Sequence, residues 1–207
     1  MLTAIILAAG ESSRMGRPKA LLGWKGRPFI EHVCLALRAA GVENRVVVLG
    51  RASGEILSAW QPGGEKTTVN PRPEDGQLAS LRAGLEAAGI NAGAFMVCLA
   101  DQPTINPETY KALIAFWRSR PGAIAIPRVE RISPSPGEPL FKRGHPIIIP
   151  AVHRHLCFEG PLDKGLHWVT HHPSVEIADL EVADRETIRD FDTPQQYEEL
   201  LAGELER

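Results

Sequence analysis

Apolar runs alternate with helical patterns along most of this chain, and that alternation constrains its fold more than any other sequence feature. The apolar runs indicate buried strands at residues 4–8, 45–49, 94–100 and 123–127, and helical patterns lie at residues 29–40, 53–60, 78–88 and 107–118. Such alternation predicts parallel strands joined by crossover helices that cover both faces of one sheet. Ligands of such sheets bind at the carboxyl ends of the strands. We therefore expect an α/β fold with its functional site at that edge.

Cap and turn residues mark the remaining segments. Asn106 before Pro107 and Thr193 before Pro194 each predict the start of a helix. Residues 128–143 contain three prolines and a glycine with little periodicity, which predicts an exposed loop. The 207 residues show no internal repeat, and this length suits one domain.

Composition argues against several classes of protein. A hydrophobic share of 43% with 23% charged residues is ordinary for a globular chain, and a net charge of -2 argues against broad nucleic-acid binding. Cys34, Cys98 and Cys157 are far apart and lack the paired spacing of a zinc or redox site. No apolar run approaches membrane length, and the short first one lacks the basic flank of a signal peptide. We expect a cytoplasmic protein without nucleic-acid or membrane partners.

The first apolar strand runs directly into a loop with the composition of a phosphate-binding site. The loop combines two glycines, two serines and three cations (Gly10, Gly16, Ser12, Ser13, Arg14, Arg17 and Lys19). Glycines allow sharp turns and close approach to a ligand, and the polar side chains supply donors and positive charge for a polyphosphate. Neither a Walker A loop nor a dinucleotide fingerprint fits the spacing. Because Pro18 interrupts a helix, we expect Lys19 to reach the phosphate from an extended segment.

The same loop resembles the signature of the MobA-like NTP transferase family. Eight positions match it (Leu7, Ala8, Ala9, Gly10, Arg14, Met15, Gly16 and Lys19). The resemblance is closest to the molybdenum cofactor cytidylyltransferases, because Ala9 stands where guanylyltransferases carry a second glycine. Asp101-Gln102-Pro103 and Gly144-His145-Pro146 match that branch too. The resemblance implies a single-domain, Rossmann-like nucleotidyltransferase fold with a mostly parallel central sheet and helices on both faces. It further implies a nucleotide-binding half at about residues 1–105 and an acceptor-binding half at about residues 106–207.

Two acidic positions could hold a divalent cation. Asp101 follows a buried strand, a placement that suits a magnesium ligand shared with a triphosphate, although it could simply cap a turn. In Asp190-Phe191-Asp192, strand alternation would turn both carboxylates to one side and Phe191 into the core. The resemblance places the second metal position in this region, with Asp192 as first choice and Asp190 as the reserve. The alternative is that Asp192 or Thr193 is only a helix cap.

The resemblance also assigns roles around the expected site. The implied nucleotide-binding residues are Leu7, Ala8, Ala9, Gly10, Ser12, Ser13, Arg14, Gly16, Lys19, Asn70, Gln77 and Ser80. The implied catalytic residues are Arg14, Lys19 and Asp101, the metal ligands Asp101 and Asp192, and the acceptor contacts Gln102, Gly144 and His145. Asn70, Gln77 and Ser80 can each donate and accept hydrogen bonds, as a base reader must, but turn or cap roles are equally open. A structural role for His145 is equally open.

These observations predict an Mg²⁺-dependent nucleotidyltransferase, with Mn²⁺ as a possible substitute. By resemblance, we expect it to transfer CMP from CTP to a molybdopterin-type acceptor, with release of pyrophosphate and delivery to a molybdoenzyme partner. Alternatives in the same class are a guanylyltransferase and a sugar-phosphate or alditol-phosphate nucleotidyltransferase. A non-catalytic carrier of molybdenum cofactor would need no metal carboxylates. A dehydrogenase is disfavoured because the chain lacks the dinucleotide glycine spacing.

Overall fold

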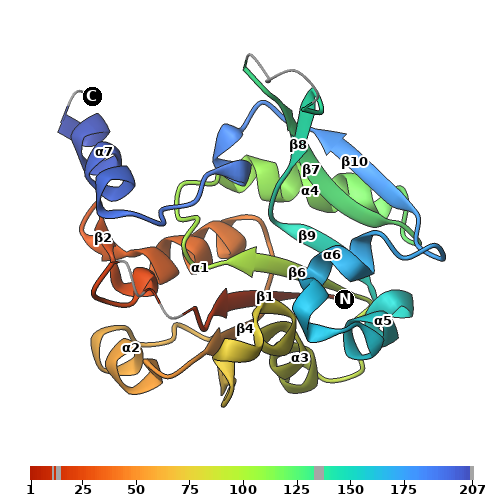
Figure 1. Ribbon diagram of the computed structural model, residues 1–207, viewed down its shortest axis with the longest axis horizontal. Helices are drawn as coiled ribbons and strands as arrows, with labels where there is room; N and C mark the ends of the chain where they lie inside the picture. The colour runs from red at the N-terminus through yellow and green to blue at the C-terminus, as the bar shows by residue number, and fades with distance from the viewer. Residues whose placement is uncertain (11, 13–14, 133–137, 206–207) are drawn as a thin grey trace.

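The computed structural model describes residues 1–10, 12, 15–132 and 138–205, and its centre is one mixed β-sheet (Figure 1). The strands lie in the order β10-β7-β9-β6-β1-β4-β5, and β8 pairs with β7. Their bounds are β1 Leu2–Ala8, β4 Asn44–Leu49, β5 Lys66–Val69, β6 Ala94–Leu99, β7 Ile124–Glu130, β8 Phe141–Arg143, β9 Ile147–Pro150 and β10 Ile177–Glu181. A separate antiparallel pair joins β2 (Gly23–Trp24) to β3 (Arg27–Pro28). The expected α/β fold with a mostly parallel sheet is confirmed.

The four strands β5, β4, β1 and β6 are all parallel, as the alternation predicted. Ile5 of β1 pairs with Val46 on one side and Val97 on the other. Because parallel strands end at the same edge, Gly10, Gly50 and Asp101 all follow strands at one edge of the sheet. This edge carries the loop and the first carboxylate singled out in the sequence.

Residues 128–143, where we expect an exposed loop or arm, contain paired strands at both ends, so a loop over the whole segment is wrong. Residues 128–130 and 141–143 pair in an antiparallel ladder between β7 and β8, with Arg128 opposite Arg143. The ladder leads into β9, which lies antiparallel between β6 and β7. A short return without a crossover helix produces antiparallel strands. Residues 133–137 lie outside the described residues.

Helices cover both faces of the sheet, as expected. Their bounds are α1 Phe29–Ala39, α2 Ser53–Ala59, α3 Gln77–Ala88, α4 Pro107–Arg118, α5 Arg154–Glu159, α6 Gly165–Thr170 and α7 Pro194–Leu205. Side chains alternate along β1, so Ile6 packs with α1, α2 and α4 whereas Ile5 packs with α3, α5 and α6. None of the helices in the described ranges combines the length and apolarity that a bilayer-spanning segment needs.

The segment before α7 returns the chain to the carboxyl edge of the sheet. It follows the 3-10 helix η5 (Arg185–Ile188), and residues 190–192 are not part of a strand, contrary to expectation. The side-chain alternation still holds, because Phe191 is fully buried against Leu22, Phe29 and Leu200. Thr193 caps α7 by accepting a hydrogen bond from the Gln196 backbone at 3.3 Å, as predicted. Figure 1 shows α7 at the opposite end of the molecule from α5 and α6.

Candidate active site

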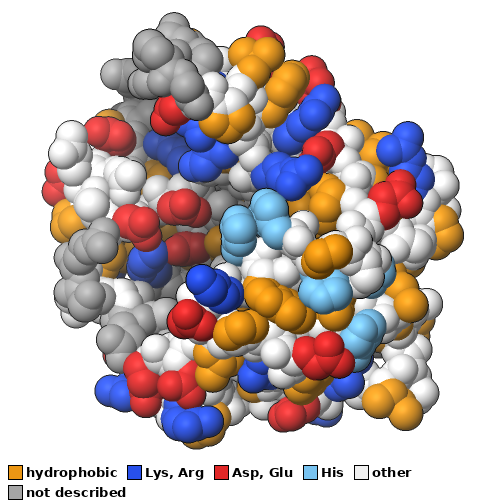
Figure 2. All heavy atoms as spheres, turned by 45° about the vertical axis from the view of Figure 1, so that its right-hand side comes forward, with side chains coloured by type: hydrophobic (Ala, Val, Ile, Leu, Met, Phe, Trp, Pro, Cys, Tyr) orange, Lys and Arg blue, Asp and Glu red, His pale blue; other side chains and the backbone are white. Residues whose placement is uncertain are grey.

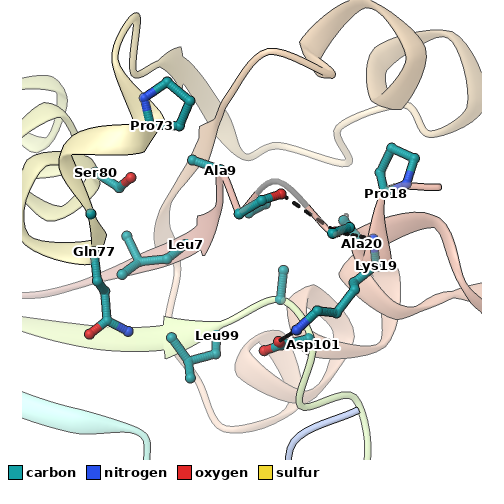
Figure 3. Close-up of a pocket in the computed structure, with 15 residues that line it drawn as sticks. Leu7, Ala9, Pro18, Lys19, Ala20, Pro73, Gln77, Ser80, Leu99 and Asp101 are labelled. Carbon is teal, nitrogen blue, oxygen red and sulfur yellow. Dashed lines mark hydrogen bonds and ion pairs between the residues drawn. The ribbon is translucent and has the colours of Figure 1, made fainter. Parts of the chain in front are cut away.

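A pocket of about 300 Å³ opens at the carboxyl edge of the parallel strands (Figure 3). It lies between the end of β1, the 3-10 helix η1 (Lys19–Leu21), the start of α3 and the end of β6. Its lining residues are Leu7, Ala8, Ala9, Gly10, Ser12, Pro18, Lys19, Ala20, Pro73, Gly76, Gln77, Ser80, Leu99, Ala100 and Asp101. In Figure 3, Lys19 and Asp101 face Gln77 and Ser80 from opposite sides of the pocket. The fold therefore brings the described part of the predicted phosphate loop, two of the three predicted base readers and the first carboxylate to one cavity.

The described part of the loop is folded back onto Lys19. Ser12 has a left-handed φ of 48°, and its Oγ accepts a hydrogen bond from the Lys19 backbone N–H at 2.9 Å. Lys19 is the first residue of η1, so the expectation of an extended segment is wrong at that residue. Pro18 itself is extended and occupies the cap position, where its missing N–H costs no helical hydrogen bond. Ser13 and Arg14 lie outside the described residues.

Lys19 joins the two carboxylates that the sequence proposed as metal ligands. Its Nζ lies 2.6 Å from Asp101 Oδ2 and 2.5 Å from Asp192 Oδ1, although these aspartates are 82 and 173 positions away along the chain. The side chains of Lys19, Asp101 and Asp192 are 19%, 21% and 49% exposed. Burial alone would lower the pKa of Lys19, but the two ion pairs outweigh burial and raise it. Lys19 is therefore a firmly charged ammonium group between two carboxylates.

Asp190 is held apart from this ion pair by Gln102. The Gln102 Nε2 donates a hydrogen bond to Asp190 Oδ1 at 3.0 Å, and Gln102 is only 2% exposed. Burial raises the pKa of Asp190, and the negative charge of Asp101 raises it further. The geometry thus pairs Asp192, rather than Asp190, with Lys19 and Asp101. Figure 2 shows acidic and basic side chains inside a hollow at the left of that view.

The three predicted acceptor contacts converge on one backbone carbonyl, that of Thr187 in η5. Gln102 Nε2 lies 3.4 Å from this oxygen, and the His145 backbone N–H donates to it at 2.9 Å. A Cβ on Gly144 would lie 2.1 Å from the same oxygen, so only glycine fits there. Burial lowers the pKa of His145 to about 4, so the imidazole is neutral at pH 7. Within the described part of the chain, His145 Nε2 and Gln102 Oε1 are buried without a hydrogen-bond partner.

The predicted base readers divide into two groups. Gln77 and Ser80 line the pocket, whereas Asn70 does not. Asn70 is buried, and its amide donates to Ser80 Oγ at 3.0 Å while its Oδ1 accepts from the Arg72 backbone. Asn70 therefore acts as the turn residue that orients Ser80, which was the alternative reading of this position.

A second cavity of about 420 Å³ shares Ala9, Gly10 and Ser12 with the first. Gly16 and Arg17 from the phosphate loop line it, together with Arg51. Sequence reasoning missed Arg51, which lies in the β4–α2 connection and also pairs with Glu74 at 3.0 Å. The sequence position of Arg51 could have indicated this role, because Arg51 closely follows the carboxyl end of β4, the strand adjacent to β1.

The donor set at Lys19 fits a divalent ion that is shared with substrate. Among the described residues, no cluster of three or more His, Cys, Asp or Glu side chains has metal-site spacing. Mg²⁺ is held in proteins by one or two carboxylates, with water and substrate phosphate completing its shell. Asp101 and Asp192 both reach one Nζ atom, so their oxygens are close enough to share a cation. They fit such a site better than a site made only of protein ligands.

Comparison with known proteins identifies the family. The family model described as MobA-like NTP transferase domain matches residues 4–173. The probable molybdenum cofactor guanylyltransferase of Deinococcus radiodurans is 32% identical over 152 residues, which cover 73% of this chain and 71% of that protein. The nicotine blue oxidoreductase of Paenarthrobacter nicotinovorans is 29% identical over 201 residues, 96% of each chain.

A solved structure shares the fold of this chain. The crystal structure of Rv0371c from Mycobacterium tuberculosis H37Rv has a TM-score of 0.83 and 26% identity and covers 97% of each chain. Its likeness extends over the antiparallel part of the sheet as well as the parallel part. The chain belongs to the MobA-like NTP transferase family and is a nucleotidyltransferase of that type.

Proposed function

We propose that this protein transfers CMP from CTP to a phosphate group of a molybdopterin-type acceptor. An acceptor phosphate oxygen attacks the α-phosphorus, the bond between the α-phosphorus and the bridging oxygen breaks, and pyrophosphate leaves. The observation that carries the proposal is the convergence of Lys19, Asp101 and Asp192 at one side of the pocket lined by Ala8, Gly10 and Gln77. In this proposal residues 1–207 form one domain, with the nucleotide side at about residues 1–105 and the acceptor side at about residues 106–207.

The roles follow from charge and position. The acceptor phosphate is already ionised, so the protein needs no general base; it must align two anions and neutralise their charge. Lys19 supplies an ammonium group beside the loop that contains Gly10 and Ser12, where the α-phosphate would lie. Arg14 would extend this positive charge, and Arg17 and Arg51 line the adjoining cavity where the departing pyrophosphate would lie.

Asp101 and Asp192 would hold the divalent cation, Mg²⁺ by preference and Mn²⁺ as a substitute. When bound, that ion supplies charge neutralisation and polarisation at the phosphoryl oxygens. Asp190 stays with Gln102 and orders the segment that carries Asp192.

Ala9 supports CTP over GTP. Its side chain belongs to the pocket lining and is almost fully buried, so a methyl group stands where guanylyltransferases, by resemblance, have only hydrogen. This methyl group narrows the pocket, which favours a pyrimidine base over the larger purine. GTP is the main alternative, because the Deinococcus radiodurans relative is named a guanylyltransferase.

The acceptor side supports a polar, heterocyclic partner. Gln102 Oε1 and His145 Nε2 are buried polar atoms without protein partners in the described residues, and the Gln102 side chain and the His145 backbone both contact the Thr187 carbonyl. Buried polar groups are normally paired, so a ligand edge with donors and acceptors would satisfy them. A molybdopterin-type ring has such an edge, and the finished dinucleotide would pass to a molybdoenzyme.

The test measures pyrophosphate release by purified protein with Mg²⁺, each of the common nucleoside triphosphates, and either molybdopterin or a panel of sugar and alditol phosphates. We expect release with CTP and molybdopterin above every other combination. Release only with GTP would move the assignment to a guanylyltransferase, and release only with a sugar phosphate would change the acceptor. Tight acceptor binding without any release would indicate a carrier.

Oxidoreduction is the second candidate, because the Paenarthrobacter nicotinovorans relative spans the whole chain. This activity would not require Asp101 or Asp192 as metal ligands. Incubation with NADH or NADPH and a quinonoid dye distinguishes it from nucleotidyl transfer. Cofactor oxidation that survives Asp101→Asn, without pyrophosphate release by the wild-type protein, would replace the proposal.

A further inference from the structure

Lys19 occupies the position between Asp101 and Asp192 where a divalent cation would be shared. Its Nζ is 2.6 Å from one carboxylate oxygen and 2.5 Å from the other. Mg²⁺ binds carboxylate oxygens at about 2.0–2.1 Å, so an ion on these two oxygens would have to lie almost where Nζ lies. The ammonium group and the ion therefore compete for the same oxygens.

Charge makes the competition stronger than size alone would. An ammonium group in direct contact with both carboxylates repels an arriving divalent cation, and partial burial weakens the screening by water. For the ion to bind, another anion must draw the Lys19 ammonium group away from the two carboxylates.

The chain allows such a movement without backbone rearrangement. The Lys19 backbone is fixed at the start of η1 by its hydrogen bond to Ser12 Oγ and by the Leu22 N–H, which donates to Lys19 O at 3.0 Å. The side chain above it is a flexible four-carbon stem. The same pocket contains Gly10 and Ser12 beside Lys19, so phosphate oxygens bound at the loop would lie within reach of the ammonium group.

We propose that Lys19 is an internal counter-ion that keeps the carboxylate pair closed to divalent cations until a nucleoside triphosphate binds. The triphosphate draws the ammonium group onto its own oxygens, and Asp101 and Asp192 then become available to the metal ion. Binding is thus ordered, with the nucleotide first and the catalytic ion second. This inference rests on the proposed function, since it assumes that the pocket takes a triphosphate.

Equilibrium binding without turnover tests this order. Mn²⁺ binding to the nucleotide-free protein is followed by water-proton relaxation, and binding of α,β-methylene CTP and GTP is followed by calorimetry in excess chelator. The wild-type protein is expected to bind a nucleotide analogue without metal and to bind Mn²⁺ weakly without nucleotide. Lys19→Met reverses this pattern: Mn²⁺ binds about tenfold tighter or more than to wild type, and the analogues bind at least about tenfold more weakly.

Two control variants make the result specific. Lys111→Met removes a lysine that pairs with Glu108 on the surface of α4, and it leaves both affinities at wild-type values. The double variant Lys19→Met/Asp101→Asn loses the Mn²⁺ affinity that Lys19→Met gains. Thermal melting checks folding, and Lys19→Gln replaces Lys19→Met if the latter unfolds.

Tight Mn²⁺ binding to the nucleotide-free wild-type protein, equal to that of Lys19→Met, overturns the proposal. Pyrophosphate release is measured separately on the same wild-type preparation. Release together with unchanged Mn²⁺ affinity in Lys19→Met refutes the counter-ion role and leaves the proposed function standing. The reversed binding pattern without release for any triphosphate refutes the proposed function and keeps the counter-ion role.

Discussion

On the proposed nucleotide side of the site, four parallel strands bring their carboxyl ends to one edge, whereas on the proposed acceptor side several segments meet at the carbonyl of Thr187. The nucleotide side is built from consecutive strand–helix units. The acceptor side depends on contacts between residues far apart in sequence, such as Gln102 with Asp190. Single substitutions should therefore destabilise the acceptor side more than the nucleotide side. Lys19 contacts residues of both sides, Asp101 and Asp192.

The largest effect is expected where both sides meet. Asp101→Asn removes a carboxylate that Lys19 contacts and that would hold the metal ion, while it keeps the shape of the side chain. We expect kcat for pyrophosphate release to fall about a thousandfold. Circular dichroism and thermal melting serve as folding controls. A kcat within a few-fold of wild type would show that the Asp101 carboxylate is not needed for catalysis.

Gly144→Ala tests the acceptor side alone. The added Cβ would lie 2.1 Å from the Thr187 oxygen, and neither backbone can give way easily. Unfolding free energy should fall by about 3 kcal/mol in denaturant titration, because overpacking forces backbone shifts. Nucleotide binding by the folded fraction should stay within about twofold of wild type. A variant as stable as wild type would mean that the close contact between Gly144 and the Thr187 carbonyl does not stabilise the fold.

Asp192→Asn and Asp190→Asn form a matched pair on one segment. Asp192 contacts Lys19, whereas Asp190 accepts from Gln102, a bond that asparagine can keep. We expect kcat to drop about a hundredfold for Asp192→Asn and less than about tenfold for Asp190→Asn. The reverse order would make Asp190 the second metal ligand.

Acid should weaken the acceptor side before the nucleotide side. Burial lowers the pKa of His145 to about 4 from an ordinary 6.5, so the unfolded chain takes up a proton that the folded chain refuses. The contribution of this residue to the unfolding free energy is complete above pH 6.5 and declines by about 3 kcal/mol as the pH falls towards 4. Denaturant titrations of wild type and His145→Gln across this range measure the difference. Parallel pH curves for the two proteins would contradict it.

The smallest effect concerns base choice on the nucleotide side. Ala9→Gly removes a methyl group from the pocket lining. We expect the ratio of kcat/KM for GTP to that for CTP to rise about tenfold, since one methyl group in a pocket contributes on the order of 1–3 kcal/mol to discrimination. Ala52→Gly, in the neighbouring cavity, is the control and should leave the ratio unchanged. An unchanged ratio for Ala9→Gly would remove Ala9 as a base selector.

The same contrast explains what the sequence could predict. The parallel strands, the helices between them and the caps at Asn106 and Thr193 follow from local periodicity and capping chemistry, and all appear in the structure. The ladder of β7 with β8 and the insertion of β9 depend on pairing partners that local pattern does not specify. Short helices such as α5 and α6 carry too few turns to give a clear period.

Site residues divide in the same way, into those that lie near sequence motifs and those whose roles depend on contacts in the folded chain. Lys19, Asp101, Gln77 and Ser80 were found because they sit in or beside recognisable loops at strand ends, and the structure gathers them around one pocket. The part played by Asn70 was not resolved, since its partner Ser80 is reached only after the chain turns into α3. Thr187 and Arg51 do not lie in recognisable motifs. They were missed because only the folded chain places Thr187 beside His145 and Arg51 in the second cavity.

The contact between Lys19 and Asp192 spans 173 positions, nearly the whole chain. Residues 7–101 include every residue that lines the pocket, whereas the second carboxylate at Lys19 comes only at position 192. Under the proposed roles, a ribosome synthesises the whole nucleotide pocket well before the residue that completes its metal site, so metal-dependent transfer has to await nearly the whole chain.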